Sequence, residues 1–179
     1  KELLEQQFIS QKLECERLGK FSSQLFDRTM EDEDFLSIRL GSGSVKAKRE
    51  INYKKQERLE VDDELQMMPA QICNDYAMIE EAPVVCDLKS VNAVGIYGSE
   101  QDRFSLMKNI VVDITARHFY SDVKIIFVVT EEHKDKVYWL RFLPHIYLDN
   151  IGVRGIVCND ESKNVLFEYL YKEITIREQ

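Results

Sequence analysis

The sequence has no long apolar run and no excess of positive charge, and each absence removes a class of protein. No stretch of about 18 apolar residues occurs, so no segment of this sequence is expected to span a membrane. Lys and Arg number 24 against 32 Asp and Glu, which gives a net charge of −8. Because nucleic-acid binding depends on a clustered basic surface, we expect no nucleic-acid partner.

Motifs for metal binding and nucleophilic catalysis are also missing. The cysteines form no Cys-x-x-Cys pair and have no histidine at metal-ligand spacing, so we expect unpaired thiols in a reducing compartment. These are Cys15, Cys73, Cys86 and Cys158. The three histidines (118, 133 and 145) lie too far apart to share a helix face, and no Gly-x-Ser-x-Gly occurs. We therefore predict no catalytic residue and no metal site.

The first 26 residues are predicted to be a stalk or linker helix rather than a core element. Residues 1–18 are rich in charge, and their apolar stripe is thin, with Leu4, Phe8, Cys15 and Leu18. The first residues have the character of a helix interior, so we expect the chain to be a piece of a longer protein. Residues 27–179 are predicted to form one α/β domain, beginning with an acidic connector at 27–34.

The rest of the chain alternates strand and helix signals. The expected elements are a strand at 35–40 with a turn at 41–44, a helix at 64–75 capped by Asp62 or Asp63 and kinked at Pro69, a strand at 82–87, a helix at 134–142, a strand at 154–158, and a last helix capped by Asn159 or Asp160. The last helix is expected to turn Val165, Leu166, Tyr169, Leu170 and Ile174 inward. This order predicts a mixed α/β fold.

The centre of the chain predicts one βαβ unit with a glycine turn. An apolar strand at 93–97 precedes Gly98, a helix follows with apolar residues at 104, 107, 111 and 114, and a second apolar strand is expected at 123–129. Against the phosphate-binding pattern G-x-x-x-x-G-K-[ST], Gly98 supplies the first glycine and Ser105 the final hydroxyl. Arg103 stands at the second glycine and Phe104 at the lysine.

These replacements weaken phosphate binding at that loop. Such a loop needs close approach of backbone N–H groups and a lysine that neutralises the phosphate oxygens. Arg103 adds a side chain where the backbone must come close, Phe104 carries no charge, and Glu100 and Asp102 add negative charge. We predict a nucleotide-binding architecture whose loop has lost its function, and no cofactor bound by this segment.

The string Trp139-Leu-Arg-Phe-Leu-Pro-His145 is the most distinctive in the chain, and two interpretations remain open. Core packing ended by the proline accounts for its composition. A recognition surface built on Trp139, Arg141, Pro144 and His145 is the sharper interpretation, because Trp and Arg are favoured anchors at interfaces. A basic cluster at Lys46, Lys48, Arg49, Lys54 and Lys55 is either a solvated surface or a docking patch for an acidic partner.

Five strings together resemble one protein family. They occur in order at 32–41, 82–84, 94–98, 122–126 and 139–145. This series resembles the region after the membrane anchor in the EssC/EccC proteins, the FtsK/SpoIIIE-type motor ATPases of type VII secretion. The resemblance covers residues 27 to about 178. It implies the stalk end and most of a degenerate first ATPase-like domain.

The resemblance implies a P-loop-NTPase-like (RecA/FtsK-like) fold with a mostly parallel sheet and flanking helices, incomplete in this chain because a Walker-B-type strand is expected after the final helix. It also implies ATP and Mg²⁺ in other modules of the parent, which lies at the cytoplasmic side of the membrane. The implied partners are the downstream ATPase modules of the same chain, other type VII secretion membrane components, and further copies in an oligomeric parent.

Three functions remain open at this stage. The first is a non-catalytic coupling domain between the membrane anchor and the downstream ATPase modules. The second is a nucleotide-binding ATPase domain with an atypical loop, in which Ser105 and Lys108 contact phosphate. The third is an adaptor that docks a secretion partner through Trp139, Arg141 and the basic cluster near Lys46.

Overall fold

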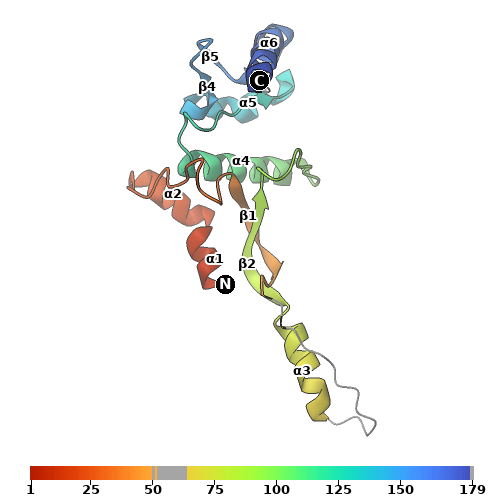
Figure 1. Ribbon diagram of the computed structural model, residues 1–179. Coiled ribbons are helices and arrows are strands. Elements are labelled where there is room, and N and C mark those ends of the chain that lie inside the picture. The colour runs from red at the N-terminus through yellow and green to blue at the C-terminus, as the bar shows by residue number, and fades with distance from the viewer. Residues whose placement is uncertain (50, 52–63, 178–179) are drawn as a thin grey trace. The chain divides into compact units, whose positions relative to one another are not determined.

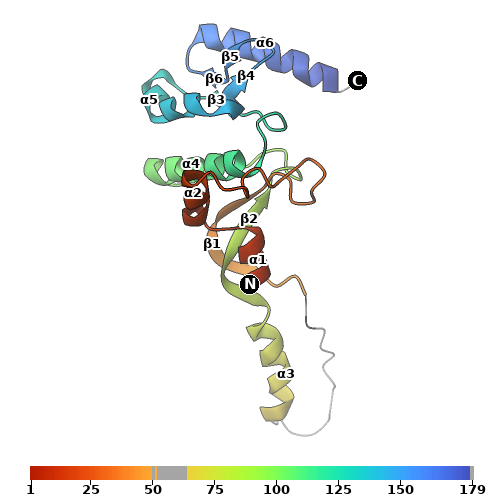
Figure 2. The ribbon, with the colours of Figure 1, turned by 90° about the vertical axis from the view of Figure 1, so that its left-hand side faces the viewer.

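The computed structural model describes residues 1–49, 51 and 64–177. It is a mixed α/β structure with small sheets and flanking helices, as Figures 1 and 2 show. Its residues divide into two compact units. Unit 1 comprises 1–22 and 36–114, and unit 2 comprises 23–35 and 115–179, so the division falls inside one long helix. These units are defined by packing alone, and the domain boundary expected after residue 26 stays a prediction.

Unit 1 is organised around a long antiparallel hairpin. Its elements are α1 (Glu2–Gln7), α2 (Gln11–Gly19), β1 (Ser37–Lys46), α3 (Glu64–Asp75), β2 (Met78–Asp87) and α4 (Glu100–Arg117), of which residues 115–117 belong to unit 2. β1 pairs with β2 from Ser37↔Asp87 to Lys46↔Met78, with irregularities after Arg39 and after Gly43. Figure 1 shows α3 at the end of this hairpin away from α4.

Three expectations for unit 1 change. The segment 41–44 is not a turn but continues β1, because β2 runs alongside and its backbone groups complete the ladder. The expected N-terminal helix is two helices, since Phe8 and Ile9 at the break are buried and pull the chain inward. α3 continues through Pro69 without interruption. The caps expected at Asp62 and Asp63, and the cations Lys54 and Lys55, lie outside the described residues.

The strand expected before α4 is wrong. Residues 93–97 adopt no regular structure, and every residue from 91 to 100 is exposed. A strand is stable when neighbouring strands take up its N–H and C=O groups. Among the described strands, none pairs with this segment, so its alternating apolar residues remain in solvent.

Unit 2 holds a small parallel sheet covered by a helix. Its elements are β3 (Phe127–Val128), a 3₁₀ turn η1 (Glu131–His133), α5 (Lys134–Val137), η2 (Tyr138–Phe142), η3 (Pro144–Ile146), β4 (Tyr147–Leu148), β5 (Val153–Arg154), β6 (Ile156–Val157) and α6 (Asp160–Arg177). β3 pairs with β6 in parallel, and β4 pairs with β5 antiparallel. The helix expected at 134–142 is therefore the short α5 followed by the 3₁₀ turn η2.

The parallel pair extends past the residues assigned to β3. The N–H groups of Phe127 and Val129 donate to the carbonyls of Gly155 and Val157 at 2.7 and 2.9 Å, and the Ile125 N–H donates to the His145 carbonyl in η3 at 2.9 Å. Gly155 allows this approach, because a Cβ there would meet the Ile125 carbonyl oxygen at 2.9 Å. Of the strand expected at 123–129, only Phe127–Val128 forms a regular strand, and its flanking residues add the hydrogen bonds given above.

The core of unit 2 forms where α6 covers the small sheet, as Figure 2 shows. Leu148, Val157 and Leu166 pack together, with Ile126, Val153 and Tyr169 partly buried against them. Asn159 caps α6 as expected, since its Oδ1 accepts the Ser162 N–H at 2.9 Å. The expectation that Val165 and Ile174 point inward is wrong, because they are 45% and 55% exposed.

The acidic connector at 27–34 packs within unit 2 against the C-terminal end of α4. The Phe26 and Arg28 N–H groups donate to the carbonyls of Ala116 and Arg117, both at 2.9 Å. Arg28 pairs with Asp34, and Arg117 Nε lies 3.6 Å from Asp27 Oδ1. The connector is therefore held by backbone hydrogen bonds and ion pairs.

Candidate functional site

The first candidate site is the turn that opens α4. Gly98 has φ of +148°, a conformation that favours glycine. Ser99 follows as the cap: its Oγ accepts the Asp102 N–H at 3.2 Å, and its carbonyl accepts the Arg103 N–H at 3.0 Å. The hydroxyl of Ser99 in turn donates to Asp102 Oδ2 at 2.6 Å. Ser99 thus caps the helix with its hydroxyl oxygen, and the same hydroxyl is hydrogen-bonded to the Asp102 side chain.

This arrangement places negative charge where a phosphate would bind. The N-terminus of a helix carries a partial positive charge that attracts anions. Here Glu100 and Asp102 lie in the first turn, and the Asp102 carboxylate is hydrogen-bonded to the cap. A polyphosphate approaching the turn would meet two carboxylates, so the intrinsic attraction of the helix end is offset.

The other residues of the loop line none of the cavities described in this chain. Arg103 and Ser105 are exposed on α4, and Phe104 is half-buried. The pockets lined by Glu14, by Ser162 and by Arg17 include no residue from 98 to 105. Gly98, Arg103, Phe104 and Ser105 are therefore adjacent on the surface of one helix start, and they enclose none of these cavities.

The second candidate site is the segment 139–145, in which some side chains are exposed on the surface and others are buried. Arg141 is stacked on two aromatic rings, with its Cζ 3.8 Å from the Tyr138 ring centroid and 4.6 Å from that of Phe142. Phe142 is 72% exposed and Tyr138 is 48% exposed. Pro144 is exposed, and Trp139 is half-buried with its indole Nε1 lacking a hydrogen-bond partner among the described residues. Sequence reasoning missed the two rings beside Arg141.

His145 belongs to the interior of unit 2. Its side chain is 1% exposed, and its Nε2 lies 2.8 Å from the His118 carbonyl oxygen. Because the carbonyl only accepts, Nε2 carries the proton and donates it. Burial lowers the pKa of His145, against the raising effect of this hydrogen bond, and Lys124 lowers it further. The imidazole is therefore neutral near pH 7.

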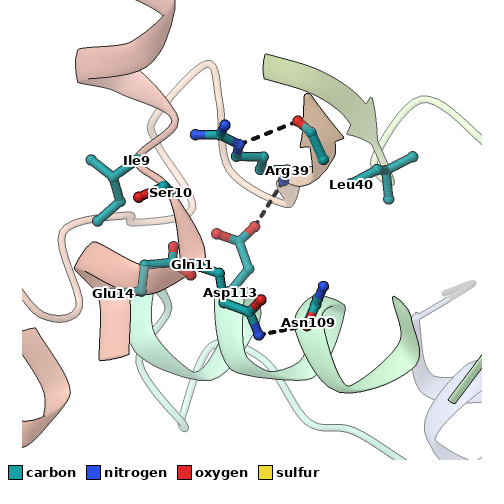
Figure 3. Close-up of a pocket in the computed structure, with 9 residues that line it drawn as sticks. Ile9, Ser10, Gln11, Glu14, Arg39, Leu40, Asn109 and Asp113 are labelled. Atoms are coloured by element: carbon teal, nitrogen blue, oxygen red, sulfur yellow. Dashed lines mark hydrogen bonds between the residues drawn. The ribbon is translucent and has the colours of Figure 1, made fainter. Parts of the chain in front are cut away.

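A third site, which sequence reasoning missed, lies between α2, β1 and α4 in unit 1. A pocket of about 150 Å³ lies there. Figure 3 shows the polar side chains that these three elements bring to it. Glu14 is 3% exposed and Asp113 is 2% exposed. The Arg39 N–H donates to Asp113 Oδ2 at 3.0 Å, and Gln11 Nε2 donates to Asn109 Oδ1 at 2.5 Å.

The sequence offers a weak signal for this site. Asp113 interrupts the apolar run 110–114 on α4, and an acid at such a position is buried or breaks the helix face. Glu14 gives no signal, because glutamate is common on exposed helices. The break between α1 and α2 turns it inward, and that break depends on the burial of Phe8 and Ile9.

Within the ranges 1–49, 51 and 64–177, no group of three or more His, Cys, Asp or Glu side chains is arranged to hold a metal ion. All four cysteines are free. No helix in the same ranges combines the length and the apolar character needed to cross a bilayer.

Comparison with known proteins finds relatives among secretion-system proteins. The type VII secretion system protein EssC of Staphylococcus aureus (strain NCTC 8325 / PS 47) is 25% identical over 156 residues, which is 87% of this chain and 10% of the relative. The ESX secretion system protein EccC of Geobacillus thermodenitrificans (strain NG80-2) is 27% identical over 158 residues, again 87% of this chain and 10% of the relative.

The chain thus spans about a tenth of the length of the curated relatives it matches. No protein-family model matches it. The matches fit a segment of an EssC/EccC-family protein.

Proposed function

We propose that this chain, as a segment of an EssC/EccC-family protein, is a non-catalytic coupling domain of a type VII secretion ATPase. It links the membrane anchor to the downstream ATPase modules of the same chain during protein export, on the cytoplasmic side of the membrane. The parent assembles as an oligomer with other type VII secretion membrane components. ATP and Mg²⁺ belong to the parent's other modules, and this segment needs no cofactor and no nucleic acid.

The observation that supports a non-catalytic role is the closed start of α4. Asp102 and Ser99 hydrogen-bond to each other there, and Phe104 replaces the lysine that would neutralise phosphate oxygens. Removing that cation from a nucleotide site eliminates its main attraction for a triphosphate. The mixed α/β fold is compatible with part of a P-loop-NTPase-like domain that has kept its helix and lost its binding loop.

The test is calorimetric titration of the 179-residue chain with Mg-ATP. We expect no binding with a Kd below about 1 mM, equivalent to about −4 kcal/mol, and no ATP turnover. The double variant Arg103→Gly/Phe104→Lys rebuilds the standard loop, and a third change, Asp102→Ser, removes the competing carboxylate. Mg-ATP binding that appears only in the triple variant would identify the Asp102 carboxylate as the group that prevents binding.

Micromolar binding of Mg-ATP by the unmutated 179-residue chain contradicts the proposal and favours a nucleotide-binding domain with an atypical loop. In that case Lys108→Ala, on the exposed side of α4, should abolish the signal, and the matched change Lys163→Ala on α6 should not. If Lys108→Ala has no effect, the atypical-loop alternative also fails.

One observation favours a second function, that of an adaptor for a secretion partner. The guanidinium of Arg141 is held on the rings of Tyr138 and Phe142, and both rings are exposed in this chain. An arginine fixed between aromatic rings loses little entropy on binding, so it suits an interface anchor. The expected partner is another membrane component of the same secretion system.

The adaptor function is tested by a pull-down with purified secretion-system components. Arg141→Ala and Phe142→Ser should each reduce capture, while Lys163→Ala leaves it unchanged. Capture that survives Arg141→Ala, Phe142→Ser and Trp139→Ala would exclude this surface. A coupling domain without adaptor activity predicts that no stable complex forms without the rest of the motor.

A further inference from the structure

The end of the β1–β2 hairpin that carries α3 exposes a row of apolar side chains. Met68, Ile72 and Tyr76 follow one another at intervals of four residues, so they lie along one side of the helix. The Tyr76 N–H donates to the Ile72 carbonyl at 3.1 Å, which extends the helical turn past α3. The three side chains are 49%, 45% and 67% exposed. A continuous apolar row of this kind usually marks an interaction surface.

Packing within the chain contributes little to α3. Among its side chains from 67 to 75, only Pro69 and Cys73 are half-buried, and the others are exposed. The Cys73 Sγ lies 3.7 Å from the Ile51 carbonyl oxygen, and Cys73 is about 100° around the helix from Ile72. A helix of 12 residues with an internal proline is marginally stable in water without packing. An apolar partner on the exposed side would therefore stabilise it.

Cations lie beside this row, on the end of β1. Lys46 pairs with Met78 across the ladder, and the Ala47 N–H donates to the Ala77 carbonyl at 2.9 Å. Lys48 and Arg49 come next and are exposed. Figures 1 and 2 show α3 at this same end of the hairpin. We call this surface the hairpin tip, and its described residues are 46–49, 51 and 67–78.

The positive charge of the hairpin tip is local. Its described side chains include three cations and one carboxylate, Asp75, in a chain whose net charge is −8. In the sequence, 46–58 contains six Lys and Arg against two Glu, and the acids of 60–64 follow. The cations are thus concentrated at the strand end, next to the apolar row.

Apolar side chains flanked by cations match the surface of an anionic bilayer. Apolar groups enter the boundary between headgroups and acyl chains, while Lys and Arg attract lipid phosphates. Tyrosine suits this boundary because its ring is apolar and its hydroxyl stays hydrated. Methionine adapts its shape to irregular apolar surroundings. A groove in a protein would accommodate the apolar row, but it would not account for the cations beside it.

We propose that the hairpin tip docks on the surface of an anionic phospholipid bilayer. Met68, Ile72 and Tyr76 enter the interface, and Lys48 and Arg49 contact lipid phosphates. The helix lies in the interface and does not cross the bilayer, because 12 residues extend about 18 Å against a hydrocarbon core of about 30 Å. This contact goes beyond the coupling role and does not depend on it.

Vesicle flotation of the 179-residue chain measures this docking. The vesicles consist of phosphatidylcholine alone, or of phosphatidylcholine with about 30% phosphatidylglycerol as the anionic lipid. We expect the anionic vesicles to bind the chain at least about tenfold more tightly than the neutral ones. Raising the salt from about 0.1 M to about 0.5 M should weaken this binding, because salt screens the attraction between cations and phosphates.

The double variant Lys48→Ser/Arg49→Ser tests the cations. It should weaken binding to anionic vesicles about thirtyfold. The matched double variant Lys89→Ser/Lys108→Ser removes the same charge from exposed positions elsewhere in unit 1. Lys89 follows the opposite end of the β1–β2 ladder and Lys108 lies on α4, so binding should fall less than about threefold.

Ile72→Ser tests the apolar row and should weaken binding to anionic vesicles at least about fivefold. The matched variant Phe167→Ser changes a side chain of nearly equal exposure on α6, 44% against 45%, and should leave binding unchanged. Hydrogen-exchange protection of the β1–β2 ladder shows that each variant is folded. If Ile72→Ser loses this protection, Tyr76→Ser decides instead, with the same expected loss of binding.

Two results overturn the proposal at the level of the unmutated chain: no binding to anionic vesicles, or equal binding to anionic and neutral vesicles. An equal loss of binding in a hairpin-tip variant and its matched control overturns it as well, because any exposed cation or apolar side chain would then suffice. A chain that does not float but binds a purified protein through Ile72 would assign the row to a protein groove, which also overturns the proposal.

Discussion

The two compact units bury titratable groups of opposite kinds, and both keep them neutral. Unit 1 encloses Glu14, whose pKa is raised to about 9 chiefly by burial. Unit 2 encloses His145, whose pKa is lowered chiefly by burial. The same physical cause, removal from water, favours the neutral form of each. The neutral form of an acid carries the proton, whereas the neutral form of a base has released it.

Titratable groups in one chain can therefore respond to pH in two opposite ways. Because the pKa of Glu14 is higher in the folded than in the unfolded state, its own contribution to the stability of unit 1 increases as the pH falls toward 4.5. Unit 2 loses stability in the same direction, because protonation of His145 is favoured only after unfolding. A single global melting curve would average these effects, so the measurements below follow each unit through its own amides.

The largest expected effect tests whether the two units respond separately. Leu166→Ala removes a side chain that is 1% exposed in the core of unit 2, which should cost about 2–5 kcal/mol. Ile38→Ala does the same in unit 1, at a side chain that is also 1% exposed. Hydrogen exchange should show Leu166→Ala loosening β6 and α6 while the β1–β2 ladder keeps its protection.

Ile38→Ala is the reciprocal control, and it should loosen the hairpin amides first. Equal loosening of both units by either variant would show that they unfold together as one cooperative unit.

The next effect sharpens the contrast in pH response. Lowering the pH from 7 to 5 should reduce the protection of unit 2 amides, because His145 has its pKa below its ordinary value of 6.5 in the folded state. The stability it contributes is complete above pH 6.5 and is lost as pH falls through 6.5 toward the folded pKa. Hydrogen exchange in the region 144–148 measures this loss.

His145→Gln keeps a side-chain N–H toward the His118 carbonyl but does not titrate in this range. The loss of amide protection between pH 7 and 5 should therefore be smaller in this variant than in the unmutated chain. An unchanged acid response in this variant would assign the effect to another group.

The smallest expected effect compares the two helix starts. Asn159→Ala removes the oxygen that accepts the Ser162 N–H and should destabilise unit 2 by about 1 kcal/mol. Ser99→Ala removes a longer cap bond at α4 and leaves the Asp102 carboxylate beside the helix end, so about 0.5 kcal/mol is expected. Urea unfolding of both variants gives the two values. A larger loss for Ser99→Ala would mean that the carboxylate depends on the serine for its position.

The sequence predicted the elements whose signals are local. The helix after Gly98, the cap at Asn159 and the strand at 82–87 each depend on neighbouring residues, and all are confirmed. The elements that failed depend on distant partners. Residues 93–97 have a strand pattern without a described strand to pair with, and Gly41 to Ser44 have a turn composition inside a ladder. The sequence alone specifies neither the lack of a pairing strand for 93–97 nor the pairing of 41–44 with β2.

The candidate sites also differ in how far local sequence predicts them. The departure from the phosphate-binding pattern at Arg103 and Phe104 is visible in the sequence itself, and the loss of binding that it predicts is what the Mg-ATP titration tests. The sequence predicted the negative charge of Asp102 at this turn but not its hydrogen bond to Ser99. The buried pair of Glu14 and Asp113 joins residues 99 positions apart, and no local pattern connects them.

The exposed segment before α4 has a practical consequence for proteolysis. Tyr97 is fully exposed, at 102%, in a stretch without regular structure, followed by Gly98. Proteases bind their substrates in extended form, so such a stretch is cleaved before folded elements are. Brief treatment with chymotrypsin, which cuts after aromatic residues, should nick the chain at Tyr97, and denaturing electrophoresis should then resolve 1–97 and 98–179 as two fragments.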